Sequence, residues 1–153
     1  MNLELRKAGT DRSVGTDERK EELPDKDLTA RIINAAIAVH KALGPGFLET
    51  IYEEALCIEL DGRNIPFERQ RSIRLTYQGK PIGEHRLDLL VAERVVVELK
   101  AIKEFEPVHF SVVRSYMKAV SVDSGLLLNF AAMPLTVKRV GREHALPDFL
   151  SAR

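Results

Sequence analysis

The segment Asp88–Lys100 constrains the fold of this chain most strongly, because it places charged residues within runs that are otherwise typical of buried strands. Residues 95–97 are three consecutive valines, as expected of a strand that is covered on both faces of its sheet. Side chains alternate along a strand, so Glu98 and Lys100 are predicted to point to the same side. The segment therefore predicts a layered fold whose core receives charged groups.

Charged groups at these positions have two interpretations. Taking carboxylates and an ammonium group out of water is costly unless they pair with one another or bind a metal. Asp88, Glu98 and Lys100 are therefore candidates for a functional site. A structural ion pair at the end of a strand is the alternative, and the spacing alone does not separate the two.

Composition narrows the class of protein. The chain has 153 residues, enough for one domain with a core, and Lys+Arg and Asp+Glu are both 23, so no global charge favours nucleic acid or a membrane. A local basic groove is compatible with this balance. The single cysteine, Cys57, excludes an intrachain disulfide and is predicted to be a buried, unreactive thiol. No apolar stretch approaches the roughly 20 residues of a membrane span, and the N-terminus lacks a signal core. We expect a cytoplasmic protein without a membrane partner.

The domain organisation follows from composition along the chain. Residues 1–27 are rich in charge and contain no aromatic residue. Such a segment cannot bury enough apolar surface to offset its ordering entropy, so it is predicted to be a disordered tail. One domain is predicted over residues 28–140, followed by a weakly patterned C-terminal tail over 141–153.

The spacing of apolar residues changes period along the domain. In chain order it predicts helices over 28–43 and 47–61, strands over 67–77, 82–91 and 95–101, a helix over 107–120, and strands over 124–130 and 135–140. The helix between the third and fourth strands indicates a crossover within a mixed sheet.

A family resemblance rests on several of these segments. Residues 46–52, Gly-Phe-Leu-Glu-Thr-Ile-Tyr, match the pattern of the GxxExxY family, and the chain resembles that family through most of residues 28–140. The family resembles a branch of the PD-(D/E)XK nuclease superfamily. The resemblance implies an α/β, restriction-endonuclease-like core, with a mixed four- to five-stranded sheet flanked by helices in the order αβββαβ. It also implies Mg²⁺ or Mn²⁺ and hydrolysis of phosphodiester bonds.

The resemblance assigns roles to individual residues. Asp88 and Glu98 would bind the metal, with the backbone carbonyl of Leu99 as a further ligand. This agrees with the preference of Mg²⁺ for one or two carboxylates together with waters and phosphate. Lys100 would orient a water molecule or stabilise charge in the transition state. Glu49 matches the helix-borne acid of the superfamily.

The chain departs from the family in the helix that follows the Glu-x-Lys strand. Relatives usually carry a glutamine four residues before a tyrosine, and here the two positions hold Val112 and Tyr116. Valine can neither bind water nor contact a nucleobase edge, so activity is expected to be reduced, altered or lost. Leu87 replaces the proline of the superfamily motif, a change that affects little.

Other residues have a structural and a functional interpretation. Tyr52 is interpreted as a packing residue with a hydrogen-bonded hydroxyl rather than as a catalyst. His109 would either shape the site or cap its helix, and Tyr116 is an accessory candidate. Glu53 and Glu54 are interpreted as surface acids that serve only solubility.

The basic stretch at residues 63–74 is interpreted as a solvated strand face, in preference to a contact with nucleic acid. Three functions are compatible with these observations. The first is a metal-dependent nuclease, with DNA favoured over RNA. The second is a catalytically weakened relative that binds nucleic acid or a protein partner. The third is a structural module with a buried ion network. A homodimer is compatible with the sequence, which defines neither substrate nor oligomeric state.

Overall fold

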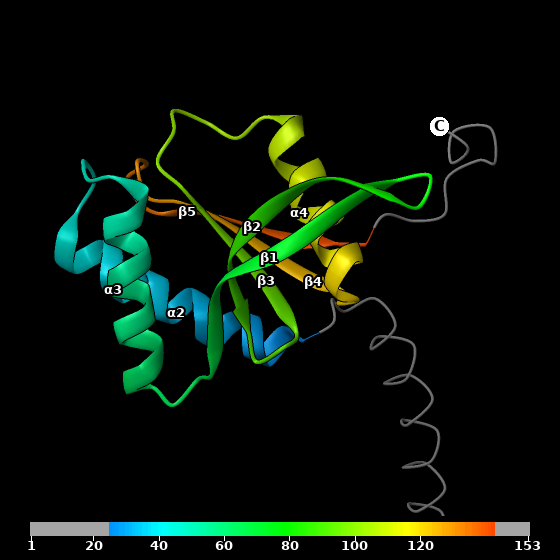
Figure 1. Ribbon diagram of the computed structural model, residues 1–153. Helices are drawn as coiled ribbons and strands as arrows, with labels where there is room; N and C mark the ends of the chain where they lie inside the picture. The colour runs from blue at the N-terminus through cyan, green and yellow to red at the C-terminus, as the bar shows by residue number, and fades with distance from the viewer. Residues whose placement is uncertain (1–24, 143–153) are drawn as a thin grey trace, which may run out of the picture.

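The computed structural model describes residues 25–142 (Figure 1). Its elements are α2 (Lys26–Leu43), α3 (Glu49–Gly62), β1 (Phe67–Tyr77), β2 (Lys80–Val91), β3 (Val95–Lys100), α4 (Pro107–Val120), β4 (Ser124–Asn129) and β5 (Thr136–Gly141). No helix within this range is long and apolar enough to cross a membrane.

The five strands form one mixed sheet in the order β1-β2-β3-β4-β5. Neighbouring strands are antiparallel except β3 and β4, which are parallel and joined by the crossover helix α4. The predicted fold class, a mixed sheet flanked by helices, is confirmed.

The sheet is covered by helices on both faces, as Figure 1 shows for α2 and α3 on one side and α4 on the other. Strand β3 lies in the middle of the sheet and divides its side chains between the two layers. Val95, Val97 and Leu99 pack in the cluster with α2 and α3, whereas Val96 packs in the cluster with α4. Because side chains alternate, Glu98 and Lys100 lie on the α4 side.

The start of the domain differs from the prediction. Helix α2 begins at Lys26, inside the segment assigned to the tail. Asp25, just before it, accepts hydrogen bonds from Arg94 and from the hydroxyl of Ser124. These partners are far away in sequence, so local composition gave no sign of them. Strand β5 likewise extends to Gly141. The remainder of both predicted tails, 1–24 and 143–153, lies outside the described residues.

The loop between α2 and α3 is fastened by Tyr52. Its hydroxyl donates to the carbonyl of Gly44 at 2.6 Å and accepts from the amide of Phe47 at 3.2 Å. Its ring is fully buried and stacks on Phe130, with centroids 4.5 Å apart. These contacts fit the packing interpretation. Helix α3 starts at Glu49, two residues later than predicted.

Candidate active site

The two acids of the Asp88–Lys100 segment lie where β2 and β3 separate. Backbone pairing between these strands ends at Leu89 and Val97. Beyond that point side chains take over the cross-strand hydrogen bonds. The Oδ2 atom of Asp88 accepts from the amide of Leu99 at 2.9 Å, and Oε1 of Glu98 accepts from the amide of Asp88 at 2.8 Å. Both carboxylates are thus fixed against backbone at the same fork.

The environment of this pair disfavours negative charge. Burial raises the pKa of Asp88 to about 6, against the lowering effect of its bond from Leu99. Burial and, after it, the neighbouring charge of Asp88 raise the pKa of Glu98 to about 8. The Lys100 ammonium group lowers both pKa values without cancelling the rise. A half-buried and a buried carboxylate that resist ionisation together form a donor set suited to a hard divalent cation.

Glu49 reaches the same region from the first turn of α3. Its Oε2 atom accepts from the amide of Ala101 at 3.2 Å, next to the end of β3. Its charge contributes to the raised pKa of both Asp88 and Glu98. The structure therefore brings Glu49 and Lys100 into electrostatic reach of the carboxylate pair.

The chain just after Lys100 is held by Asn129, at the end of β4. The Asn129 carboxamide donates to the carbonyl of Ile102 at 2.8 Å and accepts from the amide of Ile102 at 3.1 Å. Asn129 is buried, so its two bonds define the course of the loop that leaves the site.

The accessory candidates on α4 differ in their surroundings. The ring of His109 accepts from the amide of Glu106 at 2.8 Å as part of a reciprocal N-terminal cap of α4, which fits the capping interpretation. The hydroxyl of Tyr116 lies 3.5 Å from Nδ1 of His85, and burial raises the pKa of Tyr116, with smaller contributions from the charges of Glu98 and Asp88. Val112 is half-buried and packs against the cluster on the α4 side of the sheet.

Glu53 is an acid that the sequence analysis misjudged. Only 5% of it is exposed, and Arg69 donates to its Oε2 atom through Nε at 3.1 Å and Nη2 at 3.0 Å. The interpretation as a solubility residue was wrong, and Arg69 is an ion-pair partner rather than part of a solvated face. Glu53 follows Glu49 by four residues on one helical face, a spacing that could have indicated its direction.

Gln70 on β1 was missed altogether. Its Nε2 atom lies 3.0 and 3.2 Å from the two carboxylate oxygens of Glu53 and 3.5 Å from Oδ1 of Asp88. The backbone of Gln70 has φ of 52°, a left-handed conformation that is uncommon outside glycine. It stands among polar residues in an alternating strand, so the sequence pattern held no signal for this contact.

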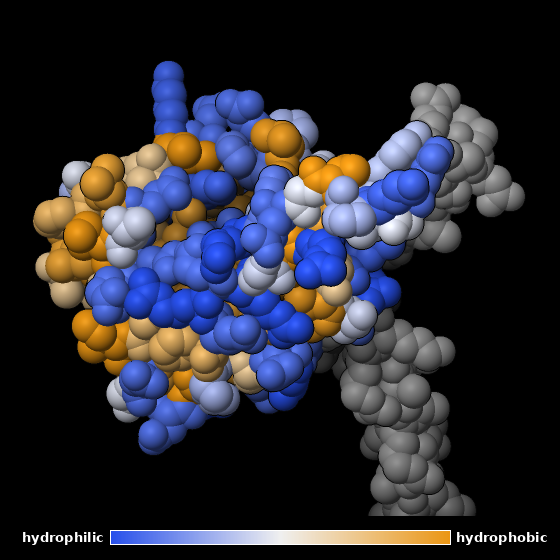
Figure 2. Space-filling model, viewed as in Figure 1, coloured by the Kyte–Doolittle hydropathy of each residue, from blue (hydrophilic) through white to orange (hydrophobic). Residues whose placement is uncertain are grey.

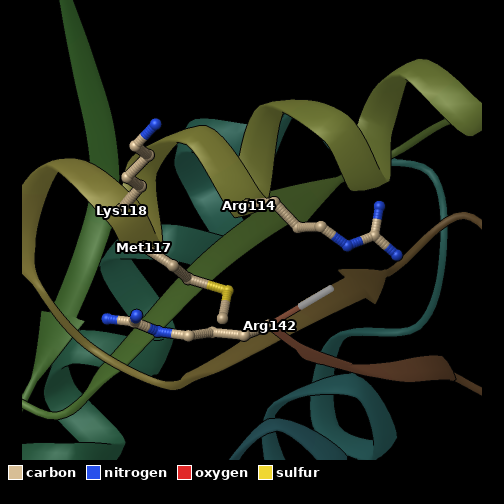
Figure 3. A pocket seen from close by; sticks show the side chains of 4 residues that line it. All are labelled: Arg114, Met117, Lys118 and Arg142. Carbon is tan, nitrogen blue, oxygen red and sulfur yellow. The ribbon is translucent and has the colours of Figure 1, made fainter. Parts of the chain in front are cut away.

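A different hollow, of about 270 Å³, lies between α4 and the end of β5 and is lined by Arg114, Met117, Lys118 and Arg142 (Figure 3). In this view the three charged ends point away from one another, so they do not converge on one anion. The carboxylate pair is the stronger site, although residues 25–142 contain no group of three or more His, Cys, Asp or Glu side chains arranged to hold a metal.

The surface next to Glu49 is apolar. Figure 2 shows hydrophobic residues gathered over α3 and the loop before it, beside a hydrophilic band that crosses the same face. The exposed apolar side chains of this region include Phe47, Leu48 and Ile51.

A family model described as the PD-(D/E)XK nuclease superfamily matches residues 26–140. The chain belongs to this superfamily. PD-(D/E)XK nucleases generally depend on divalent metals and act on nucleic acids, so the matched fold and the carboxylate pair are consistent with one another.

Solved structures are similar at low identity. The crystal structure of SSO0001 matches with 17% identity and a TM-score of 0.49, over 63% of this chain and 50% of that chain. An alkaline exonuclease from Laribacter hongkongensis, LHK-Exo, matches with 13% identity and a TM-score of 0.44, over 63% of this chain and 55% of that chain. The match thus spans about half the length of each structure. No curated protein matches the chain.

Proposed function

We propose that this member of the PD-(D/E)XK superfamily, of the GxxExxY branch, hydrolyses phosphodiester bonds of DNA with Mg²⁺ or Mn²⁺. Asp88 and Glu98 would hold the cation, together with the backbone carbonyl of Leu99. The observation that carries the proposal is the carboxylate pair at the β2–β3 fork, half-buried at Asp88 and buried at Glu98, with the pKa of both acids raised.

Each residue of the site has a definite part in this reaction. When bound, the cation supplies Lewis acidity that polarises the phosphate and makes water more acidic. Lys100 places a positive charge where negative charge grows on the phosphate oxygens in the transition state. Glu49, tied to the amide of Ala101, holds a further carboxylate beside the site. The hydrogen bonds from the backbone amides of Leu99 and Asp88 hold the carboxylates of Asp88 and Glu98 in their orientations.

The structural interpretation is less well supported. In an ion network built for stability, positive partners hold the pKa of the acids below its usual range. Here both acids have a raised pKa despite Lys100, so the pair is destabilising without a cation. Val112 leaves α4 without the glutamine amide and so favours the catalytically weakened relative. Activity measurements separate this interpretation from that of an active nuclease.

The direct test is nicking of supercoiled plasmid DNA by the purified full chain with Mn²⁺ or Mg²⁺. We expect slow, metal-dependent nicking that EDTA abolishes. Parallel reactions with single-stranded DNA and RNA define the substrate class. Binding of Mn²⁺ without cleavage of any of these would favour the weakened relative, and cleavage that persists in EDTA would contradict the proposal.

Substituting glutamine for Val112 tests the departure on α4. We expect Val112→Gln to increase the nicking rate, because the new amide can hold water or a base edge near Tyr116. Val112 is half-buried, so a small loss of unfolding temperature is expected alongside. Val120→Gln, at a half-buried position near the end of the same helix, is the matched control and should leave the rate unchanged. An equal or lower rate for Val112→Gln would show that the valine does not limit activity.

A further inference from the structure

The carboxamide of Gln70 lies between two carboxylates. Its nitrogen approaches both oxygens of Glu53 and the Oδ1 atom of Asp88. A carboxylate only accepts hydrogen bonds, so the amide nitrogen must occupy the space between the two acids, and the amide oxygen is turned away from them. The orientation of the Gln70 side chain is therefore dictated by its neighbours.

Glu53 is a firm anchor for this amide. It is buried, and two nitrogen atoms of the Arg69 guanidinium bind a single one of its oxygens. Charge-assisted bonds of this kind are stronger than those between neutral groups. Glu53 thus holds Gln70 from the side opposite Asp88, and the chain of contacts runs from Arg69 through Glu53 and Gln70 to Asp88.

The pairing of β1 with β2 is interrupted at this contact. Arg69 pairs with Leu89 and Arg71 with Leu87, but Gln70 and Asp88 between them are not paired. Gln70 takes a φ of 52° at this point. Local irregularities of strands are common next to active sites, where they redirect a side chain.

We propose that Gln70, anchored by Glu53, is a positioning residue that fixes Asp88 for binding of the divalent cation. The proposal rests on the proposed function of the site. The backbone amide of Leu99 donates to one carboxylate oxygen of Asp88, and Gln70 contacts the other. Both oxygens of Asp88 therefore have a defined direction. Gln70 is exposed on β1. It supplies a side-chain amide to the site, whereas α4 carries Val112 at the position where relatives usually have a glutamine.

The variant that tests this inference is Gln70→Gly. Glycine adopts a φ of 52° without strain, so the side chain is removed without straining the folded backbone. The measurement is titration calorimetry of the full chain with MnCl₂, together with thermal unfolding in EDTA. Loss of an outer contact to a metal ligand typically weakens metal binding by about 10- to 100-fold, and we expect the Mn²⁺ dissociation constant to rise by that factor.

The chain offers a matched control in Gln78→Gly. Gln78 has φ of 51° and is exposed in the turn between β1 and β2. Gln78→Gly adds the same conformational freedom to the unfolded chain as Gln70→Gly and removes a glutamine side chain from the same left-handed conformation. It should leave the Mn²⁺ affinity unchanged.

The outcomes separate the inference from the proposed function. Equal Mn²⁺ affinity in Gln70→Gly and the unmodified chain overturns the inference and leaves the nuclease proposal standing. Failure of the unmodified chain to bind Mn²⁺ overturns both. If Gln70→Gly unfolds at a lower temperature than Gln78→Gly, Glu53→Gln decides, because it keeps the volume but removes the charge and one of the two acceptor oxygens that anchor the amide of Gln70. Weaker Mn²⁺ binding by that variant supports the inference, and unchanged binding contradicts it.

Discussion

Asp88→Asn and Lys100→Ala should each lower the rate of metal-dependent DNA cleavage by about 100-fold or more. The first change removes a charged ligand of the cation. The second removes the ammonium group whose charge acts on the carboxylate pair and, in the proposed reaction, on the phosphate oxygens. The measurement is the initial rate of plasmid nicking at saturating Mn²⁺.

Two surface variants serve as controls for these losses. Asp123→Asn removes an acid that pairs with Arg142, and Lys138→Ala removes an exposed cation on β5. Neither residue belongs to the site, so both variants should cleave at the original rate. Cleavage that survives Asp88→Asn would point to a contaminating nuclease, and a preparation in which both controls also lose activity would show general damage to the fold.

Without metal, the free energy of unfolding should fall as the pH rises from about 5 to about 8. The pKa of Asp88 is raised to about 6 and that of Glu98 to about 8 in the folded chain. The unfolded chain releases these protons at lower pH, so it binds fewer protons throughout this window and gains stability relative to the folded state. The loss is on the order of 2 kcal/mol or more, since each unit of pKa corresponds to about 1.4 kcal/mol.

Asp88→Asn should reduce this pH dependence and increase the stability of the metal-free fold near neutral pH. The asparagine oxygen can still accept from the amide of Leu99, while the charge that repels Glu98 is gone. Thermal unfolding in EDTA across the pH window measures both effects. Added Mn²⁺ should stabilise the unmodified chain much more than the variant. A large destabilisation by Asp88→Asn would instead indicate a structural ion network.

The sequence predicted most of the secondary structure because the elements of this domain have strong periodic patterns. The valines at 95–97 placed the central strand, and alternation placed Glu98 and Lys100 on one side. The same reasoning failed for Glu53 and Gln70. A buried acid on an amphipathic helix looks like a surface acid until its partner is known, and Arg69 is 16 residues away on another element.

The site is a further case in which pattern and geometry carry different information. The resemblance assigned Asp88 and Glu98 from their motif, but no pattern could show that each would accept a backbone amide of the opposite strand. The sequence also gives no sign of the left-handed backbone of Gln70, because glutamine in an alternating run is an ordinary strand residue. The first feature depends on how β2 separates from β3, and the second on the interrupted pairing of β1 with β2, so both are properties of the assembled sheet.

The hydrogen bonds at the fork also give the two acids a structural role, because they connect β2 and β3 where the backbone hydrogen bonds between these strands end. Asp88 and Glu98 close this gap with their carboxylate oxygens. A descendant of this chain that lost cleavage would therefore still need oxygen acceptors at both positions to keep its strands together. Retention of the acid pair alone would be a poor sign of surviving catalysis in such a descendant. Lys100, for which the described residues show no comparable fastening bond, would be the first residue free to change.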